Sequence, residues 1–191
     1  MQASEFHAQL FAIRCHGEIG QLRKYTGEPY VVHPATVAEI VRSVPHTEEM
    51  LCAAWLHDVV EDTPTTIDQI RDLFGEEVAK MVWQLTKPAR SELTRAQRNV
   101  AYRASLAEAS PAVQTIKLAD IIDNTRDIRA MTHASPAFAR QYLDEKRQDI
   151  KVLTCGDPEL ITWAEHLTHE RHVSIMRSVT RFVSQHLHAK S

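Results

Sequence analysis

Glycine, proline and cysteine are all scarce in this sequence, whose 191 residues include five glycines, eight prolines and three cysteines. So few glycines and prolines exclude fibrous and low-complexity proteins. The cysteines are odd in number and form no CxxC pair. That pattern favours the reduced thiols of a cytoplasmic protein over a secreted disulfide framework. The chain is long enough to bury a hydrophobic core of its own.

Long apolar runs and an excess of basic charge are also missing. No stretch approaches the ~18 to 20 apolar residues of a membrane span, and the N-terminus lacks the basic and apolar segments of a signal peptide. The chain carries 22 Lys and Arg against 25 Asp and Glu, a net charge of −3, which argues against a non-specific nucleic-acid binder. We therefore expect a cytoplasmic protein that binds neither nucleic acid nor membrane.

The sequence does contain helical periodicity along nearly its whole length. Apolar residues recur at intervals of three and four, and no alternating strand pattern exceeds a few residues. This predicts an all-α fold, which the helix-breaking residues divide into roughly eight to ten helices. We predict one domain over residues 1–155 and a C-terminal helical extension over residues 156–191. The extension packs on the domain or forms the contact of a possible homodimer.

The same periodicity predicts which residues face inward. The segment MLCAAWLHDVV is nearly all apolar and predicts a deeply buried helix, and residues 111–131 predict one long helix. For the first helix we predict an inner stripe of Phe6, Leu10, Ile13 and the segment Cys15 to Ile19. All three tryptophans stand at positions predicted to be core, namely Trp55, Trp83 and Trp163.

Ionisable residues are concentrated at the end of the buried helix, in the segment HDVVED. His57 and Asp58 are followed within one helical turn by Glu61 and Asp62, so the carboxylates share one face. One alternative is a helix end whose charges are merely hydrated. The apolar surroundings argue against it, because burying an unpaired charge costs several kcal/mol.

Two further residues fit the same site. His33 opens a predicted helix, and Asp120 lies inside the apolar run TIKLADII, a poor place for an acid that binds nothing. Two imidazoles and two carboxylates suit a divalent ion such as Mn, Fe, Zn or Mg. Such an ion lowers the pKa of bound water and stabilises a transferring phosphoryl group, which indicates a hydrolase.

Three motifs in order, GQLRKYTGEPYVVHP, LHDVVEDT and KLADIIDNTRD, resemble the hydrolase domain of the RelA/SpoT family of alarmone enzymes. This family belongs to the HD-domain metal-dependent phosphohydrolases. The resemblance runs from about Arg14 to Asp127, with a weaker match at Tyr142. The chain leaves no room for a synthetase domain, so it is similar to the stand-alone small alarmone hydrolases.

The resemblance implies an HD-domain helical bundle that removes the 3′-diphosphate of (p)ppGpp as pyrophosphate, leaving GDP or GTP. It implies one Mn(II) ion with four ligands: His33, His57, Asp58 and Asp120. Glu61 and Asp62 would orient and deprotonate the attacking water. For the nucleotide it implies three contacts, from Arg23 and Lys24 at the base and its phosphate and from Asn124 near the ribose.

Substrate recognition also depends on residues that vary within the family. The family's KLADRLHNMRT reads KLADIIDNTRD here, which replaces its histidine by Asp123 and its base-facing threonine by Asp127. An aspartate at the latter position resembles the metazoan-type branch and could bind either guanine or adenine. The alternatives are therefore (p)ppApp, the 2′-phosphate of NADPH, or an HD-type nucleotidase reaction. For the distal phosphate we predict Arg98 and Arg103.

Other histidines and one cysteine need a separate interpretation. His166, His169 and His172 could share an ion, but a solvated polar face is the better interpretation. His16 either packs under the nucleotide pocket or is a satisfied core histidine. Cys52 precedes the site in an apolar setting, which indicates inert packing.

Overall fold

The computed structural model describes residues 4–87 and 94–169, apart from the side chains of residues 129 and 130. The predicted all-α fold is confirmed: these residues form helices and no strand, with one isolated antiparallel bridge between Leu22 and Pro29. The helical segments, of which α4 is a single turn, are α1 (Glu5–Glu18), α2 (Val32–Arg42), α3 (Glu48–Leu56), α4 (Val59–Asp62), α5 (Ile67–Phe74), α6 (Glu76–Leu85), α7 (Arg95–Ala107), α8 (Pro111–Arg126), α9 (Ile128–Ala134), α10 (Pro136–Ile150) and α11 (Pro158–Thr168).

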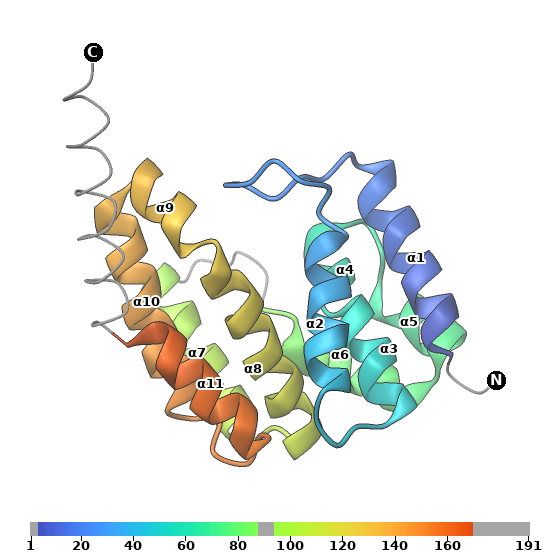
Figure 1. The fold of residues 1–191 in the computed structure, drawn as a ribbon. Coiled ribbons are helices and arrows are strands. Elements are labelled where there is room, and N and C mark those ends of the chain that lie inside the picture. The colour runs from blue at the N-terminus through green and yellow to red at the C-terminus, as the bar shows by residue number, and fades with distance from the viewer. Residues whose placement is uncertain (1–3, 88–93, 170–191) are drawn as a thin grey trace.

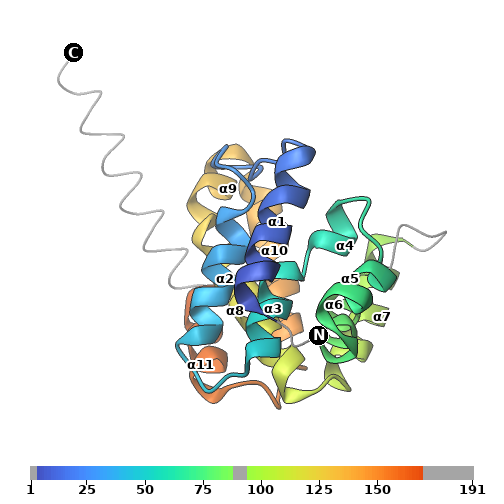
Figure 2. The ribbon, with the colours of Figure 1, turned by 90° about the vertical axis from the view of Figure 1, so that its right-hand side faces the viewer.

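Three of these helices meet in the middle of the molecule. Figure 1 shows α1 to α6 on one side, α9 to α11 on the other, and α8 running beside α2 between them. In the perpendicular view of Figure 2, α1 and α2 lie on one side of α3, and α5, α6 and α7 lie on the other. Contacts join α2 to α3, α2 to α8 and α3 to α8. Side chains from these three helices can therefore converge on one point.

Short polar side chains start most of the helices. The side chains of Thr47, Thr66 and Ser110 accept hydrogen bonds from backbone amides in the first turns of α3, α5 and α8. These bonds satisfy donors that the helix itself leaves unpaired. Gly75, with a φ of 89°, separates α5 from α6, in a conformation that side-chain-bearing residues rarely adopt.

Two predicted helices are interrupted. The helix predicted to include His57 ends one residue earlier, at Leu56, and α4 begins only at Val59. The helix predicted over residues 111–131 stops at Arg126, and α9 starts after Asp127. Both interruptions fall beside ionisable residues that make tertiary contacts, which periodicity along the sequence does not report.

The predicted inner stripe of α1 is confirmed for Cys15 and His16 and is wrong for its large apolar residues. Phe6, Leu10 and Ile13 are 62%, 47% and 43% exposed. The buried face instead carries mainly small side chains, Ala8, Ala12, Cys15 and His16. Helix α1 packs against α3, and small side chains on its inner face let the two helices approach closely.

The tryptophan prediction holds for one residue out of three. Trp55 is 5% exposed and its Nε1 donates to the Glu5 carboxylate. Trp83 is 63% exposed and Trp163 37% exposed, so both predictions of a core position are wrong. Trp163 instead lies against the guanidinium of Arg126, 5.8 Å from the ring centre. The amphipathic ring of tryptophan can cover a charged side chain at the surface.

Helix α11 packs on α8 and shares its core. Leu160 and Ala164 are buried within the same apolar cluster as α8. Just before α11, the amides of Cys155 and Asp157 donate to side chains of α8. The domain boundary at residue 156 stays a prediction, and residues 170–191 lie outside the described part of the chain. No helix among the described residues is long and apolar enough to cross a membrane.

Candidate metal centre and adjoining cavity

The four predicted metal ligands come together at the junction of α2, α3 and α8. His33 lies in the first turn of α2, His57 and Asp58 lie in the turn between α3 and α4, and Asp120 lies within α8. The two imidazole Nε2 atoms are 3.1 Å apart. From His33 Nε2, the nearest carboxylate oxygens of Asp58 and Asp120 are at 3.5 and 3.3 Å.

These separations and the type of donor both fit a metal ion. Bonds of about 2.0–2.2 Å place neighbouring ligand atoms roughly 3 Å apart. The ring nitrogen Nδ1 of His57 lies 2.8 Å from the carbonyl of Ala54, and that of His33 lies 2.7 Å from the carboxylate of Asp123. If both Nδ1 atoms donate, the two Nε2 atoms present lone pairs to each other and to two carboxylates. Such a cluster of acceptors needs a cation at its centre.

Hydrogen bonds from outside the cluster orient its two carboxylates. The Tyr30 hydroxyl donates to Asp58, while Lys117 Nζ, at 2.6 Å, and the amide of Asn124 donate to Asp120. Burial opposes the ionisation of Asp120, but the Lys117 ammonium, followed by His33 and His57 in their protonated forms, outweighs it and holds its pKa well below the usual value. Both carboxylates are therefore available as anions, since the pKa of Asp58 is also held low, against burial, by the same histidines.

A cavity of about 250 Å³ adjoins this cluster. Asp58 and Asp120 open into it, with Glu61 and Asp62 at its rim. Three ammonium groups, which the sequence analysis did not single out, also line it: Lys87, Lys117 and Lys146. Lys117 belongs to the motif KLAD, but Lys146 lies on α10, where no sequence motif marks it as a site residue. The cavity thus presents both a cation site and positive charge for anionic groups.

Glu61 and Asp62 are each held by one hydrogen bond. Glu61 accepts from the backbone amide of Lys87 at 3.1 Å, and Asp62 accepts from the Gln21 side chain at 2.8 Å. Partial burial, followed by the nearby charge of Asp58, raises the pKa of both carboxyl groups. Raised carboxyl pKa values are typical of groups that exchange protons near neutral pH.

His16 connects to the site through Gln21. Its Nδ1 lies 2.7 Å from the side-chain oxygen Oε1 of Gln21, so His16, Gln21 and Asp62 form one chain of hydrogen bonds. His16 is 1% exposed, and its Nε2 has no hydrogen-bond partner among the described residues. Among the described residues, therefore, one of the two ring nitrogens of His16 is hydrogen-bonded, and both interpretations from the sequence stay predictions.

Arg23 and Asp127, both predicted to contact the nucleotide, are bound to each other. Arg23 is 7% exposed, and its Nη2 donates to Asp127 at 2.8 Å while its Nη1 donates to Asp123 at 2.7 Å. Lys24 is exposed, with its ammonium over the rings of Tyr25 and Phe138. None of these residues lines the cavity next to the cluster. Their contacts with substrate stay predictions.

The remaining predicted site residues are spread more widely. Asn124 and Tyr142 line the cavity, whereas Arg98 and Arg103 on α7 do not. The Arg103 guanidinium lies 3.4 Å from the Asp149 carboxylate. Among the described residues the group able to hold a metal ion comprises His33, His57 and Asp58. His166 and His169 are not part of it, and His172 lies outside the described residues.

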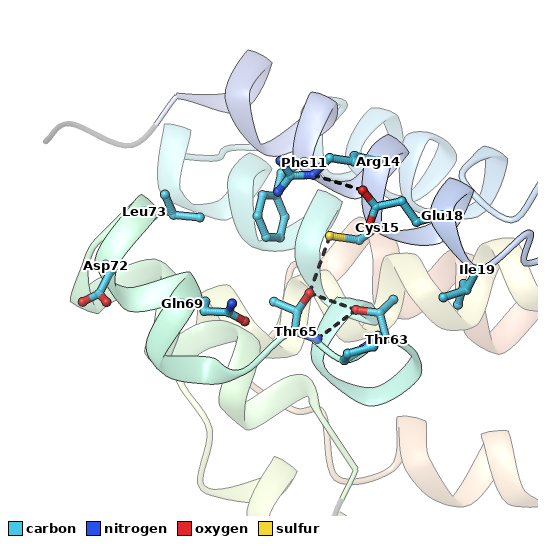
Figure 3. A pocket seen from close by; sticks show the side chains of 11 residues that line it. Phe11, Arg14, Cys15, Glu18, Ile19, Thr63, Thr65, Gln69, Asp72 and Leu73 are labelled. Atoms are coloured by element: carbon cyan, nitrogen blue, oxygen red, sulfur yellow. Dashed lines mark hydrogen bonds and ion pairs between the residues drawn. The ribbon is translucent and has the colours of Figure 1, made fainter.

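A second cavity, of about 520 Å³, lies between α1 and the segment that joins α4 to α5 (Figure 3). Cys15 faces Thr65 there, 3.5 Å between sulfur and hydroxyl oxygen. None of the predicted site residues lines this cavity. Cys52 is fully buried elsewhere, and burial raises the pKa of its thiol to about 12, which confirms inert packing.

The fold and the donor set together define a helical protein with a centre for a divalent metal ion. Residues 8–145 match the family model described as the HD domain. A human protein named "Guanosine-3′,5′-bis(diphosphate) 3′-pyrophosphohydrolase MESH1" is 32% identical over 170 residues, covering 86% of this chain and 93% of that protein. The chain therefore belongs to the HD-domain family.

Two further similarities extend this result. A Synechocystis protein named "Probable guanosine-3′,5′-bis(diphosphate) 3′-pyrophosphohydrolase" is 42% identical over 131 residues, 66% of this chain but only 17% of that protein. A solved structure described as "A metazoan ortholog of SpoT hydrolyzes ppGpp and plays a role in starvation responses" superposes with a TM-score of 0.79 at 28% identity, covering 90% of this chain and 97% of the other. The chain thus spans a small part of the bacterial relative and nearly all of the metazoan structure.

Proposed function

We propose that this protein hydrolyses the 3′-diphosphate of (p)ppGpp, releasing pyrophosphate and GDP or GTP. The observation that carries the proposal is the cavity, which adjoins the candidate metal cluster and is lined by two carboxylates with raised pKa and by three lysines. The names of the human and Synechocystis relatives, both pyrophosphohydrolases of this nucleotide, support the same reaction.

Mn²⁺ is the ion that we propose for the centre, held by His33, His57, Asp58 and Asp120. Two ring nitrogens and two carboxylate oxygens form a hard-to-borderline donor set that suits it. When bound, such an ion supplies charge stabilisation for the phosphoryl group and a lowered pKa for water. Lys117 and Tyr30 fix the two carboxylates, so they need not reorganise during the reaction.

The protein's own residues handle protons and phosphate charge. Glu61 and Asp62 stand at the cavity rim, where either carboxylate can take the proton of a water that attacks the 3′-linked phosphorus. The bond from phosphorus to the ribose O3′ then breaks, and that oxygen takes up a proton. The ammonium groups of Lys87 and Lys146 are placed to bind the departing pyrophosphate.

The test is product identification with purified, manganese-loaded protein. With ppGpp we expect GDP and pyrophosphate in equal amounts, resolved by ion-exchange chromatography. Release of orthophosphate would indicate a nucleotidase, and intact ppGpp bound to the protein would indicate a non-catalytic binding protein. Either outcome would overturn the proposal. The same assay with pppGpp, ppApp and NADPH measures the preference for base and phosphate position.

A further inference from the structure

Asp123 is a buried acid for which the family resemblance provides no role. It replaces a histidine of the family motif, lies on α8 one turn after Asp120, and is 5% exposed. One of its carboxylate oxygens, Oδ2, makes two short contacts. His33 Nδ1 and Arg23 Nη1 both lie 2.7 Å from it. A single oxygen atom thus connects α8 to α2 and to the segment between α1 and α2.

The contact with His33 determines which ring nitrogen is free. A carboxylate oxygen accepts hydrogen bonds, so the Nδ1 of His33 donates to Asp123, and Nε2 is the ring nitrogen left to offer a lone pair to an ion. This Nε2 faces Asp120 at 3.3 Å and Asp58 at 3.5 Å, within the proposed centre. His33 is only 1% exposed, so its ring is oriented by its protein neighbours rather than by bulk solvent.

Arg23 in turn fixes Asp123. Its Nη1 binds Asp123, while its Nε and Nη2 bind one oxygen of Asp127 at 3.1 and 2.8 Å. A guanidinium presents donors in a rigid plane, so pairing with two carboxylates restricts the position of both. The positive charge also compensates Asp123, a buried anion whose other arginine neighbour, Arg126, lies farther away, at 3.7 Å.

We propose that Asp123 is a positioning residue of the metal centre, which holds His33 with its Nε2 directed at the ion and is itself held by Arg23. The proposal rests on the centre described under the proposed function, but not on the identity of the substrate. Metal-bound histidines commonly depend on such a carboxylate, whose loss weakens metal binding about 10- to 100-fold.

The test is the affinity for Mn²⁺ in the absence of nucleotide, measured by competition with a chelating dye. In Asp123→Leu we expect the dissociation constant to rise about 10- to 100-fold, and in Asp123→Asn, which retains an oxygen acceptor, to rise less. Asp149→Asn is the matched control, because Asp149 is equally buried and pairs with Lys146 and Arg103 rather than with a proposed metal ligand. That variant should bind Mn²⁺ as the parent does.

Folding is kept separate from metal binding by a second variant. Asp123→Leu leaves the buried Arg23 with one partner fewer, which could by itself destabilise the fold. The double variant Arg23→Met/Asp123→Leu therefore removes both charges together. Circular dichroism checks that each variant is folded. The proposal is overturned if a folded Asp123→Leu or double variant binds Mn²⁺ within twofold of the parent. Weakened binding in these variants together with a parent that leaves ppGpp intact would refute the proposed reaction and leave the role of Asp123 standing.

Discussion

Asp62 receives a hydrogen bond from Gln21 and stands beside the cluster without being one of the four proposed ligands. We therefore predict that Asp62→Asn retains metal and loses turnover, because it removes a proton acceptor and leaves the ligands in place. The expected loss in kcat is about 10²- to 10⁴-fold. Metal content is checked by atomic absorption and kcat by pyrophosphate release. Full activity in Asp62→Asn would remove this residue from the mechanism and leave Glu61 as the acceptor.

The pKa of Lys87 leads to a prediction of how KM for the substrate depends on pH. Burial, together with the nearby ammonium groups of Lys146 and Lys117, lowers the pKa of Lys87 to about 8. Below that pH the side chain is charged and binds phosphate, and above it the charge is lost. We expect KM for ppGpp to be flat below about pH 8 and to rise roughly tenfold above it, the value of one charged hydrogen bond.

The control for this prediction is a pair of conservative variants. Lys87→Arg keeps its charge at all these pH values, so the rise in KM should disappear. Lys80→Arg changes an exposed lysine that pairs with Glu77 on α6, and the rise should persist. If Lys87→Arg shows the same rise as the parent, another group is responsible.

Alanine substitutions at two glycines, one packed against α8 and one within α1, are predicted to change the free energy of unfolding in opposite directions. A Cβ on Gly156 would lie 2.6 Å from Leu118 Cδ1 and 3.3 Å from the Gln114 backbone. Leu118 is fully buried and has little room to move. Gly156→Ala should therefore lower the free energy of unfolding by about 1–3 kcal/mol, measured by urea denaturation.

Gly17, within α1, provides the matched control. A Cβ there meets nothing within 4 Å, and alanine is the better helix former. Gly17→Ala should therefore raise the free energy of unfolding by about 0.5–1 kcal/mol. Equal effects of the two substitutions would contradict the close packing of Gly156 against α8.

Helix starts and helix faces differ in how well sequence predicts them. The caps of α3 and α5 follow from Thr47 and Thr66, because a cap is a contact between residues three positions apart. The face of α1 that becomes buried is decided by its neighbour α3. Periodicity placed the large apolar residues inside, but the interface takes small ones. The break between α8 and α9 at Asp127 could not be predicted from the sequence either, because Arg23, which binds Asp127, is distant in the chain.

At the scale of the whole molecule, the centre links the two halves of the fold. Its proposed ligands come from α2, the turn after α3, and α8, so a bound ion would connect segments that an unfolded chain leaves apart. Saturating Mn²⁺ should stabilise the protein by about 2.7 kcal/mol at a hundred times Kd. We expect Tm to rise with Mn²⁺ and to fall again with a chelator, as followed by differential scanning fluorimetry.

Two variants make this metal prediction specific. His57→Ala removes a ligand and should abolish the Mn²⁺-dependent rise in Tm, while His166→Ala, at the end of α11, should retain it. A parent protein whose Tm is unchanged at every Mn²⁺ concentration would contradict the centre. Loss of the Mn²⁺-dependent rise in Tm in His166→Ala would instead support a metal site at the C-terminal histidines.

The sequence by itself determined the helical class and most helix starts, and it singled out the acids and imidazoles that are candidates for the ligand cluster. These depend on local periodicity, on caps and on acids and imidazoles embedded in apolar runs. Only the tertiary structure decided that three lysines line the cavity, that Arg23 is tied to Asp123 and Asp127, and that Asp123 faces His33. The physical reason is distance along the chain: Arg23 and Asp123 are 100 residues apart in sequence, and their contact exists only once α2 packs on α8.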